Sequence, residues 1–422
     1  MKKCITDVLR ITLAVLTVIS VLSYCVSCTV RAIAADELSA GYERSGESGL
    51  SMTDETCAAL SDFYFEVFKN TVADDGKNEI FSPLSLIMCI GLALNGAEGD
   101  TLSEIEGVLG VDRDTLNRTL YTYVSSLVSE PDSKFLSANS VWIRNIPSAL
   151  NVKEKFLSTN AEWYGADVYS APFDRTTLDD INLWVRKNTD GMIEKILDTI
   201  PEETVIYLIN TVLFDARWRE QYEDRDVKGG DFYNRDGSTG EVSFLHSTEG
   251  VYIEGDNAKG FVKSYKKGYA FVGILPDEDV DIYEYINSLN GDVWQRMWTE
   301  RSYGERVICK LPEFEYTSDM DLKNTLTKMG ITDIFDSSRA DLSSLGDYKG
   351  APVYISGVRQ VAKIELDRNG TRAAAVTVMP GDAGASPPKE IKYVYLDRPF
   401  VYMIVDTEQG LPLFIGAVDN LR

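Results

Sequence analysis

Residues 363–386 constrain the fold more than any other stretch, because they begin as a strand and continue as neither a strand nor an ordinary loop. Ile364 and Leu366 alternate with charged neighbours, as residues do in a sheet strand. After a turn-prone break at residues 368–370, the chain continues with small and β-branched residues. Such side chains suit a pleated, half-buried surface better than a surface loop. We interpret the segment as a strand that lies outside a sheet and is able to join one.

From Thr371 onward, every second residue is uncharged. The two charged residues of the segment, Arg372 and Asp382, fall on the opposite face. Because side chains alternate along a strand, the uncharged face can be buried in a sheet while both charges point outward. For this stretch alone, an alanine-rich surface loop is the alternative. The uncharged set comprises Thr371, Ala373, Ala375, Thr377, Met379, Gly381 and Ala383.

The chain has 422 residues, of which 44% are hydrophobic, so it can bury a large core. Its 42 basic and 66 acidic residues give a formal net charge of -24 at pH 7. Such a charge repels the phosphates of nucleic acids and the headgroups of anionic membranes. We therefore expect no nucleic acid or membrane surface as a partner, and a cationic protein instead.

The first 34 residues, 1–34, have the layout of an export signal, because lysines precede an apolar run at residues 8–28. Two ends of the signal are open: a peptidase can cut after the Ala-Ile-Ala of residues 32–34, or a lipoprotein-like site can use Cys25 or Cys28. A retained membrane anchor is the third alternative, because the run is near the length that spans a bilayer. We expect the folded part outside the cytoplasm, as a secreted protein or a cell-surface lipoprotein.

Residues 35–53 are predicted to be a disordered linker, because they are polar and rich in Gly and Ser. Helical spacing of apolar residues follows, so one folded domain is predicted at residues 54–422. It contains Cys57, Cys89 and Cys309, which lack the spacing of a metal site. We interpret these cysteines as small buried hydrophobic residues rather than metal ligands or disulfide partners.

Three further segments carry clear local signals. Ser82 is a good N-cap and Pro83 fits the first helical position, before an apolar run that predicts a buried helix. Residues 204–218 are rich in β-formers with little alternation, which indicates a strand buried on both faces. Asn210 in this strand must find hydrogen-bond partners there. The residues from 396 onward predict two apolar strands.

In the same order along the chain, these segments resemble the motifs of the serpin family. The family's hinge is a Gly-Thr pair followed by small residues, and its early core helix starts with Ser-Pro-x-Ser before a Gly-x-x-x-Asp-Thr. A strand with an Asn that closes with a Trp, and two recurrent positions near the C-terminus, complete the resemblance. The matching residues are Gly370, Thr371, Ala373, Ala374 and Ala375 in the hinge, Ser82, Pro83, Ser85, Gly96, Asp100 and Thr101 in the early helices, Asn210 and Trp218 in the strand, and residues 398–400 and 414–416.

The resemblance implies an α+β fold, the single-domain serpin fold with three β-sheets, about nine α-helices and an exposed reactive-centre loop. It implies a monomer without a cofactor or a metal ion. Together with the export signal, it leads us to expect an exported family member from a prokaryote.

The resemblance also implies suicide inhibition of a serine protease. In this mechanism the protease attacks the exposed loop and forms an acyl-enzyme. Before the acyl-enzyme is hydrolysed, the freed loop from Thr371 onward inserts into the central sheet and carries the protease along, which distorts the protease active site. The alternative is a non-inhibitory serpin that acts as a carrier, a chaperone or a surface-binding protein.

Two positions depart from the family pattern. The family commonly has Glu just before the hinge and Lys at a position that pairs with it, where this chain has Arg368 and Glu313, so we expect an ion pair of reversed sign. The family also has a His that bonds the strand Asn, and here Gln360 is able to replace it as the partner of Asn210. Arg368 is counted with the hinge, and the predicted sheet-opening region comprises Ser82, Ser85, Asn210, Trp218, Glu313 and Gln360.

Counting forward from the hinge by the family's usual loop length places the reactive bond between Gly384 and Ala385, within the region from Ala383 to Ser386. Counting back from the C-terminal motif gives Pro388 instead, whose ring fits a protease cleft poorly. The preferred neighbourhood has no Lys, Arg or aromatic residue. It favours an elastase-like or subtilisin-like target over a trypsin-like or chymotrypsin-like one.

An enzymatic function is disfavoured, because the sequence has no GxSxG, HExxH, P-loop or GxGxxG pattern. A Ser-His-Asp site would depend on the chain's one histidine, His246, which lies in a strand-like run and is interpreted as structural. We also expect no heparin-type site, because Arg113 and Arg118 are the only basic residues in residues 112–128.

Overall fold

The computed structural model describes residues 32–43, 49–72, 75–127, 129–145, 150–348, 353–371 and 390–422. The chain divides into two compact units, Met1–Ala34 and Ala35–Arg422. Of the first unit only residues 32–34 are described, so the fold below is that of the second. Among the described residues, no helix combines the length and the apolar character that a membrane span requires.

Nine α-helices lie in the described part of the second unit. The buried helix predicted after Ser82 is α3, in which Pro83 is the first residue and every residue is buried. The Ser82 hydroxyl accepts a hydrogen bond from the Ser85 amide, as an N-cap does. The helices are α2 (Asp54–Thr71), α3 (Pro83–Leu94), α4 (Gly99–Leu109), α5 (Arg113–Ser126), α6 (Glu154–Tyr164), α7 (Arg175–Asn188), α8 (Ile282–Ser288), α9 (Gly291–Glu300) and α10 (Lys323–Lys328).

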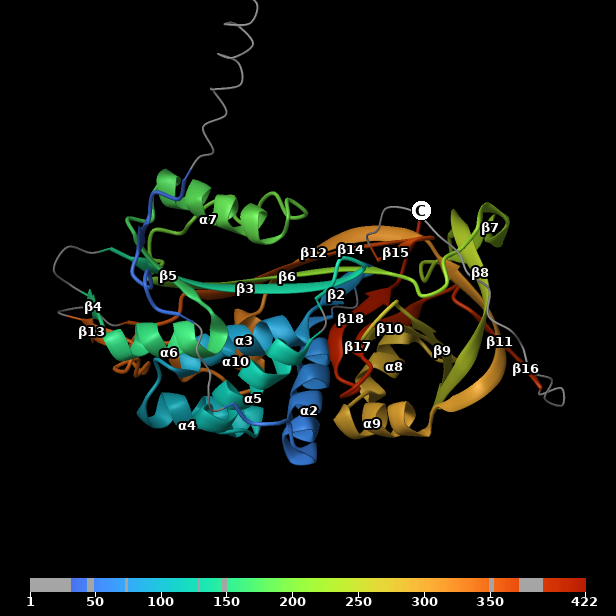
Figure 1. Ribbon diagram of the computed structural model, residues 1–422, viewed down its shortest axis with the longest axis horizontal. Helices are drawn as coiled ribbons and strands as arrows, with labels where there is room; N and C mark the ends of the chain where they lie inside the picture. Colours follow the sequence, from blue (N-terminus) through green and yellow to red (C-terminus); the bar gives the residue numbers. More distant parts are fainter. Residues whose placement is uncertain are drawn as a thin grey trace, which may run out of the picture. The chain divides into compact units, whose positions relative to one another are not determined.

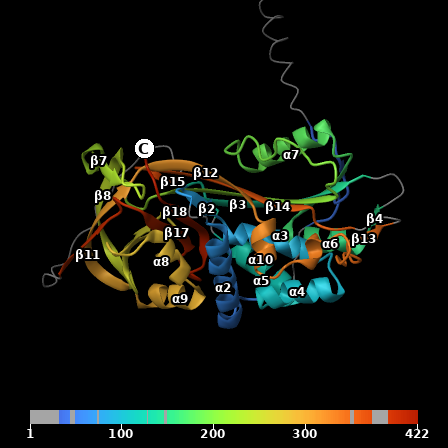
Figure 2. The same ribbon diagram turned by 180° about the vertical axis from the view of Figure 1, so that it is seen from behind.

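A seven-stranded sheet has the strand order β1-β5-β3-β6-β15-β14-β12. The strand predicted to be buried on both faces is β6, in the middle of this sheet, and Asn210 in it is buried. Helix α7 covers one face of the sheet, while α3 and α6 lie on the other, in the view of Figure 1 and from behind in Figure 2. The strands are β1 (Asp36–Glu37), β3 (Ser133–Arg144), β5 (Asp167–Ala171), β6 (Ile206–Arg217), β12 (Phe314–Asp321), β14 (Gly357–Asp367) and β15 (Gly370–Thr371).

A nine-stranded sheet has the order β16-β11-β8-β9-β10-β17-β18-β2, with β7 beside β8, and β13 and β4 form a third sheet. The two apolar strands predicted near the C-terminus are β17 and β18, which are buried throughout. Nine α-helices and three sheets in one compact unit of the described chain confirm the predicted fold. The remaining strands are β2 (Glu79–Phe81), β4 (Leu150–Val152), β7 (Val227–Tyr233), β8 (Thr239–Gly255), β9 (Ala258–Ser264), β10 (Tyr269–Pro276), β11 (Ser302–Pro312), β13 (Gly346–Tyr348), β16 (Ile391–Tyr395), β17 (Phe400–Asp406) and β18 (Pro412–Val418).

The disordered linker predicted at residues 35–53 is wrong for its first part, because β1 pairs antiparallel with β5. The Leu38 N–H then donates a 2.7 Å hydrogen bond to the Val168 carbonyl, and the Val168 N–H donates a 2.9 Å bond to the Ser39 hydroxyl. A sheet edge offers unpaired backbone groups that bond an extended backbone whatever its side chains are. Polar composition alone therefore failed to predict this segment.

The cysteines of the described chain, Cys57, Cys89 and Cys309, are free thiols. Cys89 and Cys309 are buried as predicted, while Cys57 is half-buried. Burial raises the pKa of the Cys89 thiol to about 12, so this side chain stays protonated and acts as a hydrophobic residue.

Glu79, at the start of β2, carries its carboxyl group in an unfavourable environment. Burial and then the charge of Asp75 raise the pKa of Glu79 from 4.5 to about 7. Its Oε2 atom is buried and has no hydrogen-bond partner in the described part of the chain. Between these two pKa values the folded protein binds more protons than the unfolded chain, so its stability falls as the pH rises through this window.

We predict that Glu79→Gln raises the apparent melting temperature near pH 8, where wild-type Glu79 is charged, and leaves it unchanged near pH 4, where both side chains are neutral. Differential scanning calorimetry at one scan rate measures the difference. Glu278→Gln, which removes an exposed carboxylate, is the matched control. An equal gain at both pH values would contradict the prediction.

Candidate functional site

The hinge residues Gly370 and Thr371 form the short strand β15, which lies inside the seven-stranded sheet between β6 and β14. Thr371 is opposite Ala216 of β6 and Leu366 of β14. Gly370 has a φ of 155°, and a Cβ atom there would lie 2.1 Å from the Ala216 carbonyl oxygen. Only glycine fits this close approach of the two backbones.

Strands β6 and β14 are joined at two places only, as far as the described residues go. At one end β15 lies between them, and at the other end Gly357, Val358 and Arg359 pair directly with β6 in parallel register. Between these joins, residues 210–215 of β6 and 360–365 of β14 are not paired with each other. The facing edges of both strands can therefore accept the backbone of a further strand.

A pair of buried aromatic residues holds the hinge. The Thr371 side chain is 2% exposed, and its hydroxyl is 2.7 Å from the Tyr265 hydroxyl. Tyr265 stacks on Trp218, with ring centroids 4.4 Å apart and planes 10° apart. The Trp218 indole N–H donates a 2.9 Å bond to the Asp367 carbonyl, so the two rings bind the chain on both sides of the turn.

The turn that connects β14 to β15 is fixed by its own side chains. The Asp367 carboxylate accepts hydrogen bonds of 2.7 Å from the Asn369 amide and 3.2 Å from the Gly370 amide. The carbonyl of Asn369 accepts a 3.0 Å bond from the Trp218 amide, and that of Arg368 accepts a 3.2 Å bond from Tyr222. These side-chain and backbone bonds define the conformation from which the loop leaves the sheet.

Arg368 and Glu313 form the expected ion pair, but it is the weaker of two. The Arg368 Nε atom is 3.9 Å from the Glu313 carboxylate, which also accepts a 3.1 Å bond from the Arg368 amide. The guanidinium lies closer, at 2.5 Å, to Asp224 of the 3-10 helix η1 (Asp224–Asp226), a contact that the sequence did not indicate. Asp224 is exposed, and Arg368 and Glu313 are half-buried and still reach water, so each pair contributes about 0–1 kcal/mol.

Beneath the hinge lies a buried ion pair. Lys263 is 4% exposed, bonds Glu249 at 2.9 Å, and lies 4.4 Å from the ring centroid of Tyr222 and 5.5 Å from that of Trp218. Burial lowers the pKa of Lys263, but the charge of Glu249 and the hydrogen bond to it outweigh burial, so the pKa of Lys263 lies above its ordinary value. Lys263 therefore stays charged and holds the two rings by cation–π contacts. Local sequence patterns do not indicate this pair, because Glu249 lies on β8 and Lys263 on β9.

The start of α3 binds both strands of the opening. Gln360 of β14 accepts a 2.8 Å bond from the Ser82 amide and donates a 2.9 Å bond to the Ser82 carbonyl. Asn210 of β6 accepts a bond from the Ser85 hydroxyl and donates a 2.6 Å bond to Asn139 of β3. The expectation that Gln360 is the partner of Asn210 is therefore wrong, because the backbone at Ser82 satisfies both groups of the Gln360 amide.

Part of the predicted site lies outside the described residues. These are the hinge residues Ala373, Ala374 and Ala375 and the reactive region Ala383, Gly384, Ala385 and Ser386. The described chain ends at Thr371 in one sheet and resumes at Glu390, before β16 at the edge of the other sheet.

Comparison with known proteins identifies the family. Residues 58–421 match the family model described as "Serpin (serine protease inhibitor)". The rat alpha-1-antiproteinase is 26% identical over 85% of this chain and 87% of its own length. Human thyroxine-binding globulin is 23% identical with a TM-score of 0.77, covering 86% of this chain and 98% of its own, and it therefore shares the fold.

The thermophilic serpin tengpin has been solved in two states. Its native state is 38% identical, with a TM-score of 0.87, covering 92% of this chain and all of tengpin. Its latent state is 36% identical, with a TM-score of 0.78, over 89% of this chain and all of tengpin. The structure is more similar to the native state. Its hinge lies at one end of an opening in the seven-stranded sheet, and residues 58–421 match the family model, so this chain belongs to the serpin family.

Proposed function

We propose that this protein inhibits a serine endopeptidase by cleavage of its reactive loop and insertion of that loop into the seven-stranded sheet. The serpin family contains protease inhibitors as well as non-inhibitory carriers, so family membership alone does not decide between the two functions. The features of the site must decide. The observation that carries the proposal is the position of Thr371, which is buried at the entrance to the unpaired stretch between β6 and β14. A loop that continues from Thr371 is aligned to extend β15 along both facing edges.

In the proposed mechanism the protease serine attacks the carbonyl carbon of the residue before the cut and forms an ester, and the amine on the other side leaves. The freed segment then inserts from Thr371 onward, at roughly 3.3 Å per residue. Each new ladder hydrogen bond contributes about 0.5–1.5 kcal/mol, and the small side chains on the uncharged face are buried as well. In this mechanism the cut frees the loop from β16, so that it can insert along its length and realise this gain.

A non-inhibitory carrier, chaperone or surface-binding protein is the alternative. It would not need a hinge that is able to enter the sheet. Arg372 is one residue beyond Thr371 and falls on the opposite face of the strand, so its charge does not oppose insertion. The pattern of this hinge therefore favours the inhibitor.

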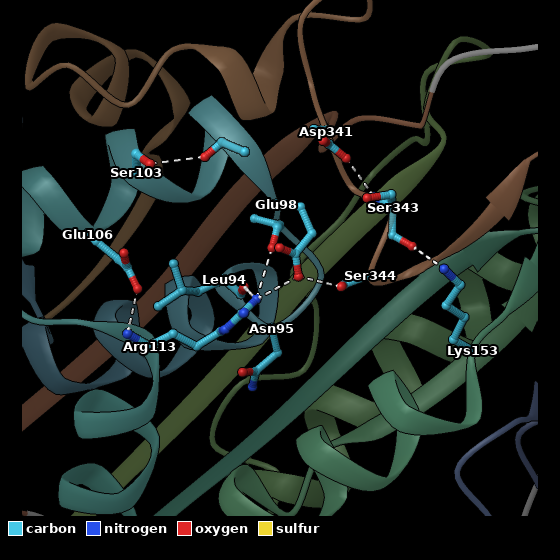
Figure 3. A network of polar contacts seen from close by, with 12 residues as sticks. Leu94, Asn95, Glu98, Ser103, Glu106, Arg113, Lys153, Asp341, Ser343 and Ser344 are labelled. Carbon is cyan, nitrogen blue, oxygen red and sulfur yellow. Dashed lines mark hydrogen bonds and ion pairs between the residues drawn. The ribbon is translucent and has the colours of Figure 1, made fainter.

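We expect no heparin-type cofactor, because the two basic residues of α5 are already engaged. Arg113 donates hydrogen bonds of 3.4 Å to the Leu94 carbonyl and 2.9 Å to the Ala97 carbonyl, and lies 3.3 Å from the Glu98 carboxylate (Figure 3). Arg118 pairs with Asp114 at 3.4 Å. These contacts neutralise the charges that a polyanion would need.

The target is proposed to be an elastase-like or subtilisin-like protease that meets the inhibitor outside the cytoplasm. The region around Gly384 and Ala385 offers small side chains to the specificity pocket. The net charge of -24 accelerates the encounter with a cationic protease at low ionic strength. Secretion, or attachment to the cell surface as a lipoprotein of a prokaryote, follows from the export signal.

We predict that incubation with pancreatic elastase or subtilisin gives a covalent complex that survives a denaturing gel, and that Thr371→Arg abolishes it while the loop is still cut. An arginine at this position would bury an unpaired charge beside Tyr265, so insertion would become slower than hydrolysis of the acyl-enzyme. The control Thr371→Ser keeps the hydroxyl and should retain the complex. Cleavage of the wild-type protein without any complex would support the non-inhibitory alternative.

We predict that Tyr265→Phe and Thr371→Val each lower the apparent melting temperature of the uncut protein, because each removes a buried hydrogen bond that contributes about 1 kcal/mol. The double variant should melt no lower than the less stable single variant, because both changes remove the same bond. Calorimetry at one scan rate measures this. The control is Tyr285→Phe on α8: its decrease in melting temperature should add to that of Thr371→Val. If the decreases caused by Tyr265→Phe and Thr371→Val were additive, the two side chains would not share a hydrogen bond.

We predict that elastase cuts between Gly384 and Ala385. Mass spectrometry of the C-terminal fragment that the reaction releases locates the cut, and the fragment should begin at Ala385. Trypsin should be inhibited poorly, because no basic residue lies in this region. A fragment that starts outside residues 383–387, or inhibition of trypsin without inhibition of elastase, would overturn the assignment.

A further inference from the structure

The first residue of the folded unit, Ala35, bonds a buried carboxylate. The Ala35 backbone nitrogen donates a 2.9 Å hydrogen bond to Oδ2 of Asp180 on α7. The Asp180 side chain is 1% exposed. Directly after Ala35 the chain continues as β1 on the edge of the seven-stranded sheet, where the bonds of Leu38 and Ser39 to Val168 hold it. The position of the Ala35 nitrogen is therefore set by its own strand.

The surroundings of Asp180 are acidic. Burial and then the charge of Asp167 raise the pKa of Glu37 in β1, with Lys187 opposing them. Burial followed by the charges of Asp167, Glu37 and Asp180 raises the pKa of Tyr169 in β5. Glu37, Asp167 and Asp180 come from three different elements, and all three lie close enough to Tyr169 to raise its pKa. A positive charge at the Ala35 nitrogen would be stabilised by Asp180, which this nitrogen contacts at 2.9 Å.

We infer that Asp180 is the binding site for the amino terminus of the mature protein, which is created by cleavage between Ala34 and Ala35. Residues 32–34 read Ala-Ile-Ala, the small-residue pattern that signal peptidases cut after. Two independent features thus mark the same bond: a cleavage pattern that ends at Ala34, and a buried carboxylate that already contacts the nitrogen which cleavage would free.

The chemistry at this bond is a hydrolysis. Water adds its hydroxyl to the Ala34 carbonyl carbon, the C–N bond breaks, and the Ala35 nitrogen takes a proton to become an amine. An α-amine has an ordinary pKa of about 8, so it takes a second proton at neutral pH and becomes an ammonium. A neutral amide donor is thereby replaced by a charged one at the same distance from Asp180. Charge-assisted bonds of this kind are roughly twice as strong as neutral ones.

The inference distinguishes the two open ends of the export signal. A lipid-modified Cys25 or Cys28 would leave Ala35 inside the chain, and its nitrogen would remain an uncharged amide beside Asp180. Cleavage after Ala34 supplies the cation that the buried carboxylate can pair with. In the processed form the contact between Ala35 and Asp180 becomes a charge-assisted one, so this is the form that the site fits best.

The first test is the amino terminus of the exported protein. The full-length chain with its own signal is expressed in a bacterium with a general secretory pathway, and the exported product is measured by intact-mass spectrometry and N-terminal sequencing. The expected product begins at Ala35. A product that begins at a lipid-modified Cys25 or Cys28, or at any other residue, overturns the inference.

The second test measures the Ala35 amine itself. Protein that starts at Ala35 is treated with a water-soluble acetylating reagent near neutral pH, and acetylation of its N-terminal peptide is followed by mass spectrometry. Only the neutral amine reacts, so an ion pair that raises the amine pKa by about one unit slows acetylation about tenfold. We expect this protection in the wild type and its loss in Asp180→Asn. Asp179→Asn removes the neighbouring carboxylate on the same helix and should keep the protection.

A chain that starts at Ala32 keeps the experiment decisive if Asp180→Asn fails to fold. Its amine lies three residues before Ala35, so it should react at the ordinary rate although Asp180 is intact. Equal rates for the two chains, or equal rates for Asp180→Asn and the wild type, would refute the ion pair. The test does not depend on protease inhibition, so the proposed function and this inference can fail separately.

Discussion

The proposed function of this molecule depends on one incomplete strand pairing. Strands β6 and β14 are held together at one end by three directly paired residues and at the other by the two residues of β15. In a continuous sheet, alternate residues along each strand edge bond the neighbouring strand through their N–H and C=O groups. Residues 210–215 of β6 and 360–365 of β14 do not make these bonds with each other. The native state therefore lacks stabilising hydrogen bonds that a complete sheet would make, and an inserted strand could supply them.

The start of α3 explains how the two strands stay in place without pairing. Ser82 binds Gln360 on one strand through its backbone, and Ser85 binds Asn210 on the other through its hydroxyl. The strands are thus attached to the same helix end rather than to each other. Between the two joins, the facing edges of the strands are thus held side by side without being bonded to each other.

Local sequence signals predicted the helices and strands, but they did not predict the contacts between segments that are distant in the sequence. The Ser82 cap, the buried strand with Asn210, and the Gly370-Thr371 pair each follow from neighbouring residues, and the fold class came from their order along the chain.

Tyr265, Lys263 and Asp224 carry no local signal, because their roles depend on rings and charges that come from other elements of the fold. Gln360 was assigned the wrong partner, since a backbone group that a side chain can bond leaves no trace in the sequence. The disordered linker predicted at residues 35–53 is wrong at its start, because the backbone pairing of β1 with β5 does not depend on side-chain polarity.

Arg368 stands where the family commonly has Glu, and this change of charge gives the hinge turn a second ionic contact. Two opposite charges attract equally whichever of them is positive. Replacing the family's Glu and Lys by Arg368 and Glu313 therefore preserves the Coulomb energy at a given distance. The geometry is not preserved, because a guanidinium carries several donors in a fixed plane. Arg368 therefore reaches Asp224 on η1 as well as Glu313 at the junction of β11 and β12, and its backbone bonds both Glu313 and Tyr222. A carboxylate at this position would be repelled by Asp224. The reversed sign thus lets one side chain connect the hinge turn to two further elements, each through a weak contact.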